Sequence, residues 1–64
     1  MRIPYFAFQL PDGRFLGRAF FHDPLGPQPA ERAVPFSAKG VKARQAELLA
    51  SFPGAKVVPN PNMN

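Results

Sequence analysis

The tripeptide Pro11-Asp12-Gly13 is the feature that most constrains the fold of this chain. Proline presets φ for the first central position of a type I turn, and aspartate tolerates the bridge region that follows. Glycine then takes the left-handed position of a G1 bulge. The tripeptide therefore predicts a β-hairpin whose loop pairs Leu10 with Arg14, with strands over about residues 3–10 and 14–22.

Alternation along the two strands divides the side chains of this hairpin between two faces. The register set by the loop pairs Phe8 with Leu16, Phe6 with Arg18 and Tyr5 with Ala19. The first face is aromatic and basic, and consists of Phe6, Phe8, Leu10, Arg14, Leu16, Arg18 and Phe20. The second face has small residues along its middle, and consists of Ile3, Tyr5, Ala7, Gln9, Phe15, Gly17, Ala19 and Phe21. Because small residues let a helix lie close to a sheet, the second face is predicted to receive the helix.

Residues 23–36 are rich in proline and predict an extended, partly polyproline-like connection. This connection can bend over the first face and cover it with three apolar side chains, Leu25, Val34 and Phe36. Residues 32–36 are a possible short edge strand, since proline is tolerated at the edge of a sheet.

A helix is predicted after this connection, with Ser37 as its N-cap and Pro53-Gly54 as its stop. Its core-facing stripe is predicted to contain Ala38, Val41, Gln45, Leu48, Leu49 and Phe52. Residues 56–58 then form a short strand, and residues 60–64 a flexible tail. We therefore predict one α+β domain over residues 1–59, in which a small antiparallel sheet packs on one helix.

Composition narrows the sources of stability and the classes of function. A chain of 64 residues has a thin core, and it contains no cysteine and one histidine, which excludes a disulfide framework and a Cys/His zinc site. Stability must then come from packing, from rigid prolines or from a partner. Eight Lys and Arg against four Asp and Glu favour a polyanion or an acidic protein surface as partner, although a charge of +4 also serves solubility.

Catalysis, cofactor binding and membrane insertion are not expected. His22-Asp23 is the one adjacent histidine–carboxylate pair, and neighbouring strand residues point to opposite faces. The four acids are scattered, so we expect neither a metal site nor a cofactor. No apolar run approaches the ~20 residues that span a bilayer, and we expect no signal peptide in the N-terminal residues. We expect a cytoplasmic, non-enzymatic protein without a membrane partner.

Nucleic-acid binding is the leading functional hypothesis. Proteins that bind single strands use aromatic side chains on a sheet for stacking and basic groups for the backbone. The predicted site residues for single-stranded DNA or RNA are Phe6, Phe8, Arg14, Arg18 and Phe20, with Lys39 and Lys42 of the helix. The alternative interpretation of these residues is structural, with the phenylalanines in the core and the arginines along an edge.

A protein–protein module or a homodimer that uses the same face is the second hypothesis. An apolar face, an edge strand and a proline-rich connection are common docking features of small proteins. In size and in the order of its elements, the chain resembles some very small phage-encoded proteins that bind and inhibit host enzymes such as RNA polymerase. That resemblance implies an inhibitor or adaptor of a larger protein.

Overall fold

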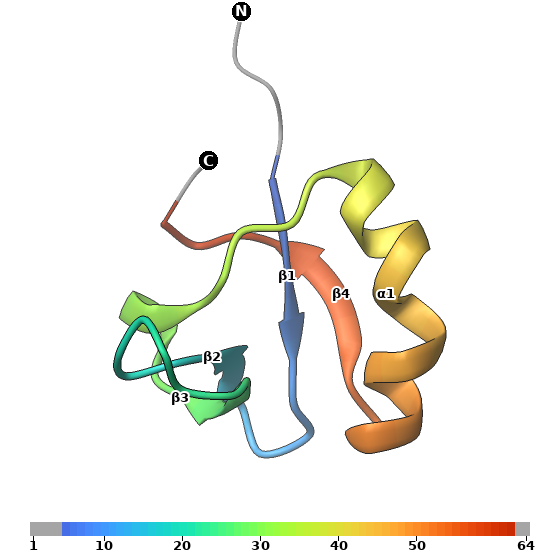
Figure 1. The fold of residues 1–64 in the computed structure, drawn as a ribbon. Coiled ribbons are helices and arrows are strands. Elements are labelled where there is room, and N and C mark those ends of the chain that lie inside the picture. The colour runs from blue at the N-terminus through green and yellow to red at the C-terminus, as the bar shows by residue number, and fades with distance from the viewer. Residues whose placement is uncertain (1–4, 63–64) are drawn as a thin grey trace, which may run out of the picture.

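The computed structural model describes residues 5–62 and confirms the α+β class and the predicted order of elements (Figure 1). Within these residues, four strands form one antiparallel sheet in the order β3-β2-β1-β4. The strands are β1 (Phe6–Gln9), β2 (Phe15–Gly17), β3 (Gly26–Gln28) and β4 (Lys56–Pro59). The helix α1 (Ala38–Ser51) packs against this sheet, and a 3₁₀ turn, η1 (Ala30–Arg32), precedes it in the chain.

The closed end of the β1–β2 hairpin has the predicted geometry. The backbone N–H of Leu10 donates to the carbonyl of Arg14 at 2.7 Å, and the N–H of Gly13 donates to the carbonyl of Leu10 at 2.9 Å. Gly13 has a φ of +94°, which is the left-handed conformation expected of the third loop residue. Gln9 lies opposite Phe15, in the predicted register. The predicted beginning of the first strand, including Ile3, lies outside the described residues.

The open end of the hairpin differs from the prediction, because β2 ends at Gly17 and not near residue 22. Phe6 does not pair with Arg18. It exchanges two backbone hydrogen bonds with Phe36 instead, at 2.8 and 2.9 Å. Residues 33–36 therefore occupy the place beside β1 that the longer second strand was predicted to fill.

The edge strand of the connection also lies earlier than predicted. Residues 32–36 do not form a regular strand, and they reach the sheet through isolated bridges from Ala33 to Gly17 and from Phe36 to Phe6. The edge strand is β3, which pairs with β2. Pro27 lies within β3, and its missing N–H is tolerated there because β3 is at the edge of the sheet.

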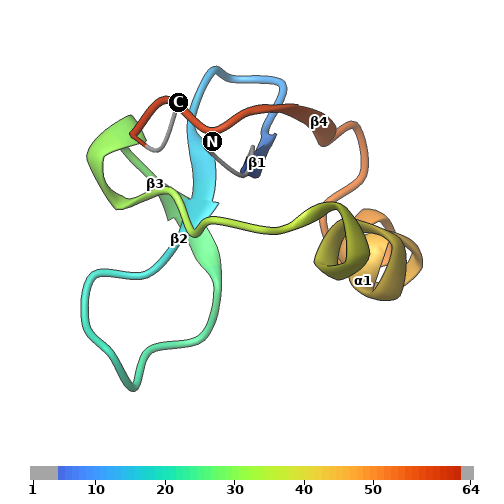
Figure 2. The same cartoon turned by 90° about the horizontal axis from the view of Figure 1, so that it is seen from above.

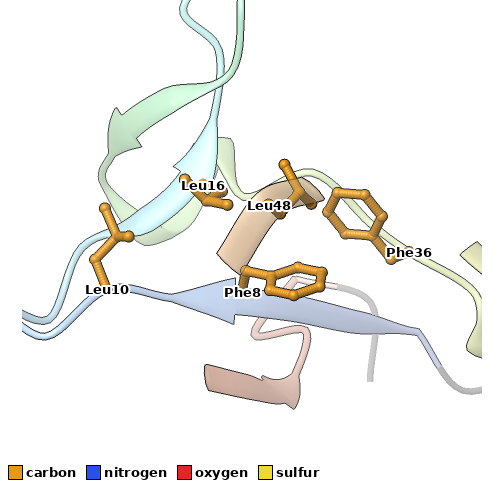
Figure 3. Close-up of a cluster of buried hydrophobic side chains, with 5 residues drawn as sticks. All are labelled: Phe8, Leu10, Leu16, Phe36 and Leu48. Carbon is orange, nitrogen blue, oxygen red and sulfur yellow. The ribbon is translucent and has the colours of Figure 1, made fainter. Parts of the chain in front are cut away.

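The core forms on the first face of the hairpin. Its fully buried members are Phe8 and Leu16, and Leu10, Phe36 and Leu48 complete the cluster (Figure 3). The rings of Phe8 and Phe36 meet edge to face with their centroids 5.2 Å apart. Phe36 thus covers this face, as predicted for the connection, with Leu25 and Val34 packed against the cluster.

The prediction that the second face receives the helix is wrong, because Leu48 of α1 packs in the cluster on the first face. One small residue of the second face, Gly17, instead lies against a close backbone segment. An added Cβ at Gly17 would lie 2.0 Å from the carbonyl oxygen of Arg32, at the end of η1. The absence of a side chain at Gly17 therefore allows close contact with this turn.

Helix α1 begins as predicted, with the Ser37 hydroxyl accepting a hydrogen bond from the N–H of Gly40 at 3.1 Å. Its predicted stripe is only partly correct. Leu48 is buried and Val41 is half-buried, whereas Gln45 is exposed. The other stripe residues divide in the same way, with Leu49 and Phe52 half-buried and Ala38 exposed. The helix is held to the sheet by a narrow set of contacts.

The last described residues are bound to the rest of the fold. Strand β4 confirms the short strand predicted at residues 56–58. The next residue, Asn60, is 1% exposed, and its backbone N–H donates to the carbonyl of Tyr5 at 3.0 Å. The amide nitrogen of Asn62 donates to the carbonyl of Ala30 at 2.6 Å. These contacts differ from the flexible tail expected from residue 60, and residues 63–64 lie outside the described part of the chain.

Candidate binding surfaces

The predicted site residues do not form one surface. Phe8 is completely buried in the core, so the prediction that it stacks on a ligand is wrong. Phe6 is half-buried and lies at a groove beside α1. Arg18 and Phe20 belong to the connection between β2 and β3, at a different groove. The continuous aromatic and basic face predicted for the hairpin therefore does not exist.

Arg14 is engaged within the hairpin loop. Its side chain forms an ion pair with Asp12, with Nη2 2.7 Å from Oδ2, and its Nε donates to the same oxygen at 2.7 Å. The backbone N–H of Arg14 donates to Oδ1 of Asp12 at 2.9 Å. The side-chain and backbone hydrogen bonds from Arg14 hold the pKa of the Asp12 carboxyl below its usual value. These bonds stabilise the hairpin loop and hold the Arg14 side chain within it.

Residues 18–25 form a projecting loop between β2 and β3, which we name the aromatic loop (Figure 2). Its tip carries Phe20 and Phe21, whose exposed fractions are 74% and 84%. The carboxylate of Asp23 accepts a hydrogen bond from the N–H of Phe20 at 3.2 Å, and the backbone N–H of Asp23 donates to the carbonyl of Phe20 at 3.0 Å. Arg18 donates from Nη1 to the carbonyl of Phe21 at 3.3 Å. The exposed tip is thus a hydrogen-bonded turn.

A shallow groove of about 500 Å³ lies beside this tip, and we name it the aromatic groove. Residues 18–21 of the aromatic loop form one wall, and residues 31–35 form the other. Arg18, Arg32 and Glu31 give its lining charges of both signs. None of these three side chains has an ion-pair partner among residues 5–62. The groove therefore combines aromatic side chains with unpaired charges.

A second groove, of about 350 Å³, lies between α1 and the sheet, and we name it the helix groove. Its lining is mostly apolar and consists of Phe6, Ala38, Val41, Lys42, Gln45 and Val57. Val57 lies opposite Phe8 in the β1–β4 ladder, so its side chain is on the helix side of the sheet. Lys39 is exposed on α1 and does not line this groove.

Of the nine residues that line the aromatic groove, only Arg18 and Phe20 were predicted as site residues, and the aromatic and basic side chains that the prediction missed are Phe21 and Arg32. A signal for Phe21 was present in the chain, because Asp23-Pro24 favours the start of a turn. A turn there shortens the second strand, and both phenylalanines then leave the sheet. Arg32 had no such signal, because its position depends on the path of η1 over Gly17.

The comparisons add no relative to this picture. No family model, curated protein or solved structure matches the chain significantly. Function must therefore be inferred from the two grooves and the exposed loop.

Neither a cluster of metal-ligating side chains nor a membrane-spanning helix is found within residues 5–62. No group of three or more His, Asp or Glu side chains within residues 5–62 is placed to hold a metal ion. The one α-helix of this part of the chain, α1, is too short and too polar to cross a bilayer. The surface features that bear on binding in this part of the chain are the aromatic loop with its groove, the helix groove and the exposed lysines.

Proposed function

We propose that this chain is a non-catalytic protein-binding module whose anchor is the aromatic loop. The observation that supports this most directly is the exposure of Phe20 and Phe21, while the other described phenylalanines are buried or half-buried. Fully burying a phenylalanine side chain contributes about 1.5–3 kcal/mol. Burial of these two adjacent exposed rings by a partner would therefore contribute a large part of the free energy of binding.

The composition of the aromatic groove matches a protein interface. Aromatic residues and arginine are enriched at the centre of such interfaces, and lysine is depleted there. The groove has Phe20 and Phe21 beside Arg18 and Arg32, and no lysine. A matching partner has an apolar pocket for the rings, with acidic and basic groups around that pocket.

Binding of single-stranded nucleic acid is the second candidate. Arg18 and Phe20 both line the aromatic groove, and an aromatic ring with a nearby arginine supports stacking on a base. Three lysines, Lys39, Lys42 and Lys56, have no ion-pair partner among residues 5–62 and give α1 and β4 a positive charge. We rank this candidate second because Phe8 is buried, Arg14 is paired with Asp12, and Glu31 opposes a polyanion in the groove.

Two matched double variants distinguish these candidates. Phe20→Ser/Phe21→Ser removes the exposed rings, and Lys39→Ser/Lys42→Ser removes two exposed lysines of α1. A protein partner recovered with the wild type and then purified should bind the wild type and the lysine variant equally. Loss of the two rings should weaken its binding by about 30-fold or more, the effect expected of an interface hot spot.

The nucleic-acid arm uses a fluorescent oligothymidylate of about 12 nucleotides, a length within the range of single-strand sites. Binding that weakens steeply with added salt and falls in the lysine variant would favour the second candidate. A purified partner that binds the loop variant as tightly as the wild type would contradict the first.

A further inference from the structure

We propose that the protein bound by the aromatic loop is a second copy of this chain. This inference rests on the proposed function, because it names the partner of the same surface. Two properties of that surface support the inference, its shape and its charges. The third argument is the thin core of the monomer.

The surface holds both halves of a self-complementary contact. The aromatic loop carries two exposed rings, Phe20 and Phe21, and both residues also line the aromatic groove. The far wall of this groove includes Ala33, Val34 and Pro35, which give it an apolar lining. In a two-fold dimer the same patch faces itself, so the rings of each copy enter the groove of the other.

The charges of the groove also complement themselves. Arg18 and Arg32 lie in the same lining as Glu31, and none of them has an ion-pair partner among the described residues. A two-fold axis reverses the patch, so Arg18 on the loop wall of one copy meets Glu31 on the opposite wall of the other. A strongly basic or acidic partner would match only part of this surface, whereas a second copy matches both signs.

The monomer is short of internal stabilisation, and a dimer supplies more. Chains below about 70–80 residues usually need disulfides, a metal, oligomerisation or unusually good helix packing. This chain has no cysteine, its described residues hold no metal cluster, and Leu48 is the only buried side chain of α1. Burying the rings of Phe20 and Phe21 between two copies adds apolar area that the monomer leaves in water.

Analytical ultracentrifugation of the full chain tests the inference, over about 1 μM to about 1 mM protein. The wild type should sediment as a dimer at the high end, and its Tm should rise with concentration. Phe20→Ser/Phe21→Ser should weaken self-association by about 30-fold or more, while Lys39→Ser/Lys42→Ser should leave it unchanged. A wild type that stays monomeric throughout, or a loop variant that dimerises equally well, would overturn the inference.

A charge exchange tests the two-fold arrangement without removing apolar area. Arg18→Glu and Glu31→Arg each place like charges across the axis, so each variant alone should dimerise more weakly than the wild type. In an equal mixture, the glutamate introduced in one chain faces the arginine introduced in the other, and the native pair faces correctly as well. The mixture should therefore recover association; a mixture that stays monomeric would overturn this arrangement.

The two proposals fail differently. If the wild type is monomeric but binds a purified heterologous protein through Phe20 and Phe21, the proposed function stands and the second copy is excluded. If the ring variant changes neither self-association nor any purified partner's binding, both are wrong. Circular dichroism of each variant at low concentration confirms that the monomer remains folded before either conclusion is drawn.

Discussion

Two pairs of phenylalanines in this molecule have opposite environments. Phe8 and Phe36 are buried and meet edge to face, whereas Phe20 and Phe21 are largely exposed. Residue type is the same in both pairs, so side-chain hydrophobicity does not explain the difference. The backbone does, because Phe8 lies in β1 between two neighbouring strands and Phe36 is bridged to β1, while the other pair lies in a loop.

The two environments originate at the point where the hairpin opens. At Gly17 the chain leaves the ladder, and residues 33–36 take its place beside β1. That exchange brings Phe36 into the core and releases Phe20 from the first face. The replacement of the second strand by residues 33–36 beside β1 thus produces both the closed core and the exposed aromatic loop.

Removing a ring from the buried pair should have the largest effect. A Phe→Ala change in a core typically costs about 3–5 kcal/mol, and a domain of this length has a total stability of about 3–10 kcal/mol. Phe8→Ala should therefore lower the free energy of unfolding by about 3–5 kcal/mol, a large part of the total. Chemical denaturation followed by far-UV circular dichroism measures this loss.

Phe21→Ala is the matched change in the exposed pair, because it removes the same atoms. At a concentration where the wild type is monomeric, its stability should stay within about 0.5 kcal/mol of the wild type. A large loss of monomer stability in this variant would mean that the aromatic loop is part of the core, and the comparison between the pairs would fail.

The next effect in size concerns Gly17, where the two environments separate. An added Cβ would lie 2.0 Å from the carbonyl oxygen of Arg32 and 2.8 Å from its carbonyl carbon. Both are backbone atoms, so η1 or β2 must move to accept it. Gly17→Ala should destabilise the fold by about 1–3 kcal/mol, as overpacking does in other cores.

Gly26→Ala is the control for this change, since nothing lies within 4 Å of a Cβ built at Gly26. Both glycines pair with each other in the β2–β3 ladder, so the two variants share the same strand context. Equal destabilisation by both variants, measured in urea, would show that loss of glycine in the ladder matters and that the contact with Arg32 does not.

The parts of the fold that the sequence could predict are those with local signals. Pro11-Asp12-Gly13 determines the loop and its register, and Ser37 caps the helix because its hydroxyl reaches the N–H of Gly40. These interactions span at most four residues. Local chemistry is therefore sufficient for the hairpin loop, for the beginning of α1 and for the order of elements.

The helix face and the candidate site depend on contacts between distant parts of the chain. Whether Phe6 pairs with Arg18 or Phe36 depends on competition between two segments for the same strand edge, and alternation along one strand cannot decide it. The same competition decides whether Phe20 lies on the sheet. For that reason the prediction was only partly useful. Arg18 and Phe20 do line one groove, but the prediction grouped them with residues that lie in the core and in the hairpin loop.

The smallest expected effect lies at the closed end of the hairpin, where Asp12 and Arg14 are exposed. Hydrogen bonds from Arg14 lower the pKa of Asp12 below 3.8, so the folded state favours the carboxylate. This contribution to stability is present above the unfolded pKa and is lost as the pH falls through the folded pKa. Solvent screening keeps it small.

Asp12→Asn tests this contribution, because asparagine can still accept the backbone hydrogen bond from Arg14 but cannot form the ion pair. The wild type should lose more stability than the variant as the pH falls from neutral to below 3.8, the usual value for this carboxyl. Thermal unfolding of both proteins across that range measures the difference. Parallel curves would mean that the ion pair of the hairpin loop is formed without stabilising it, and that the turn depends on its backbone geometry alone.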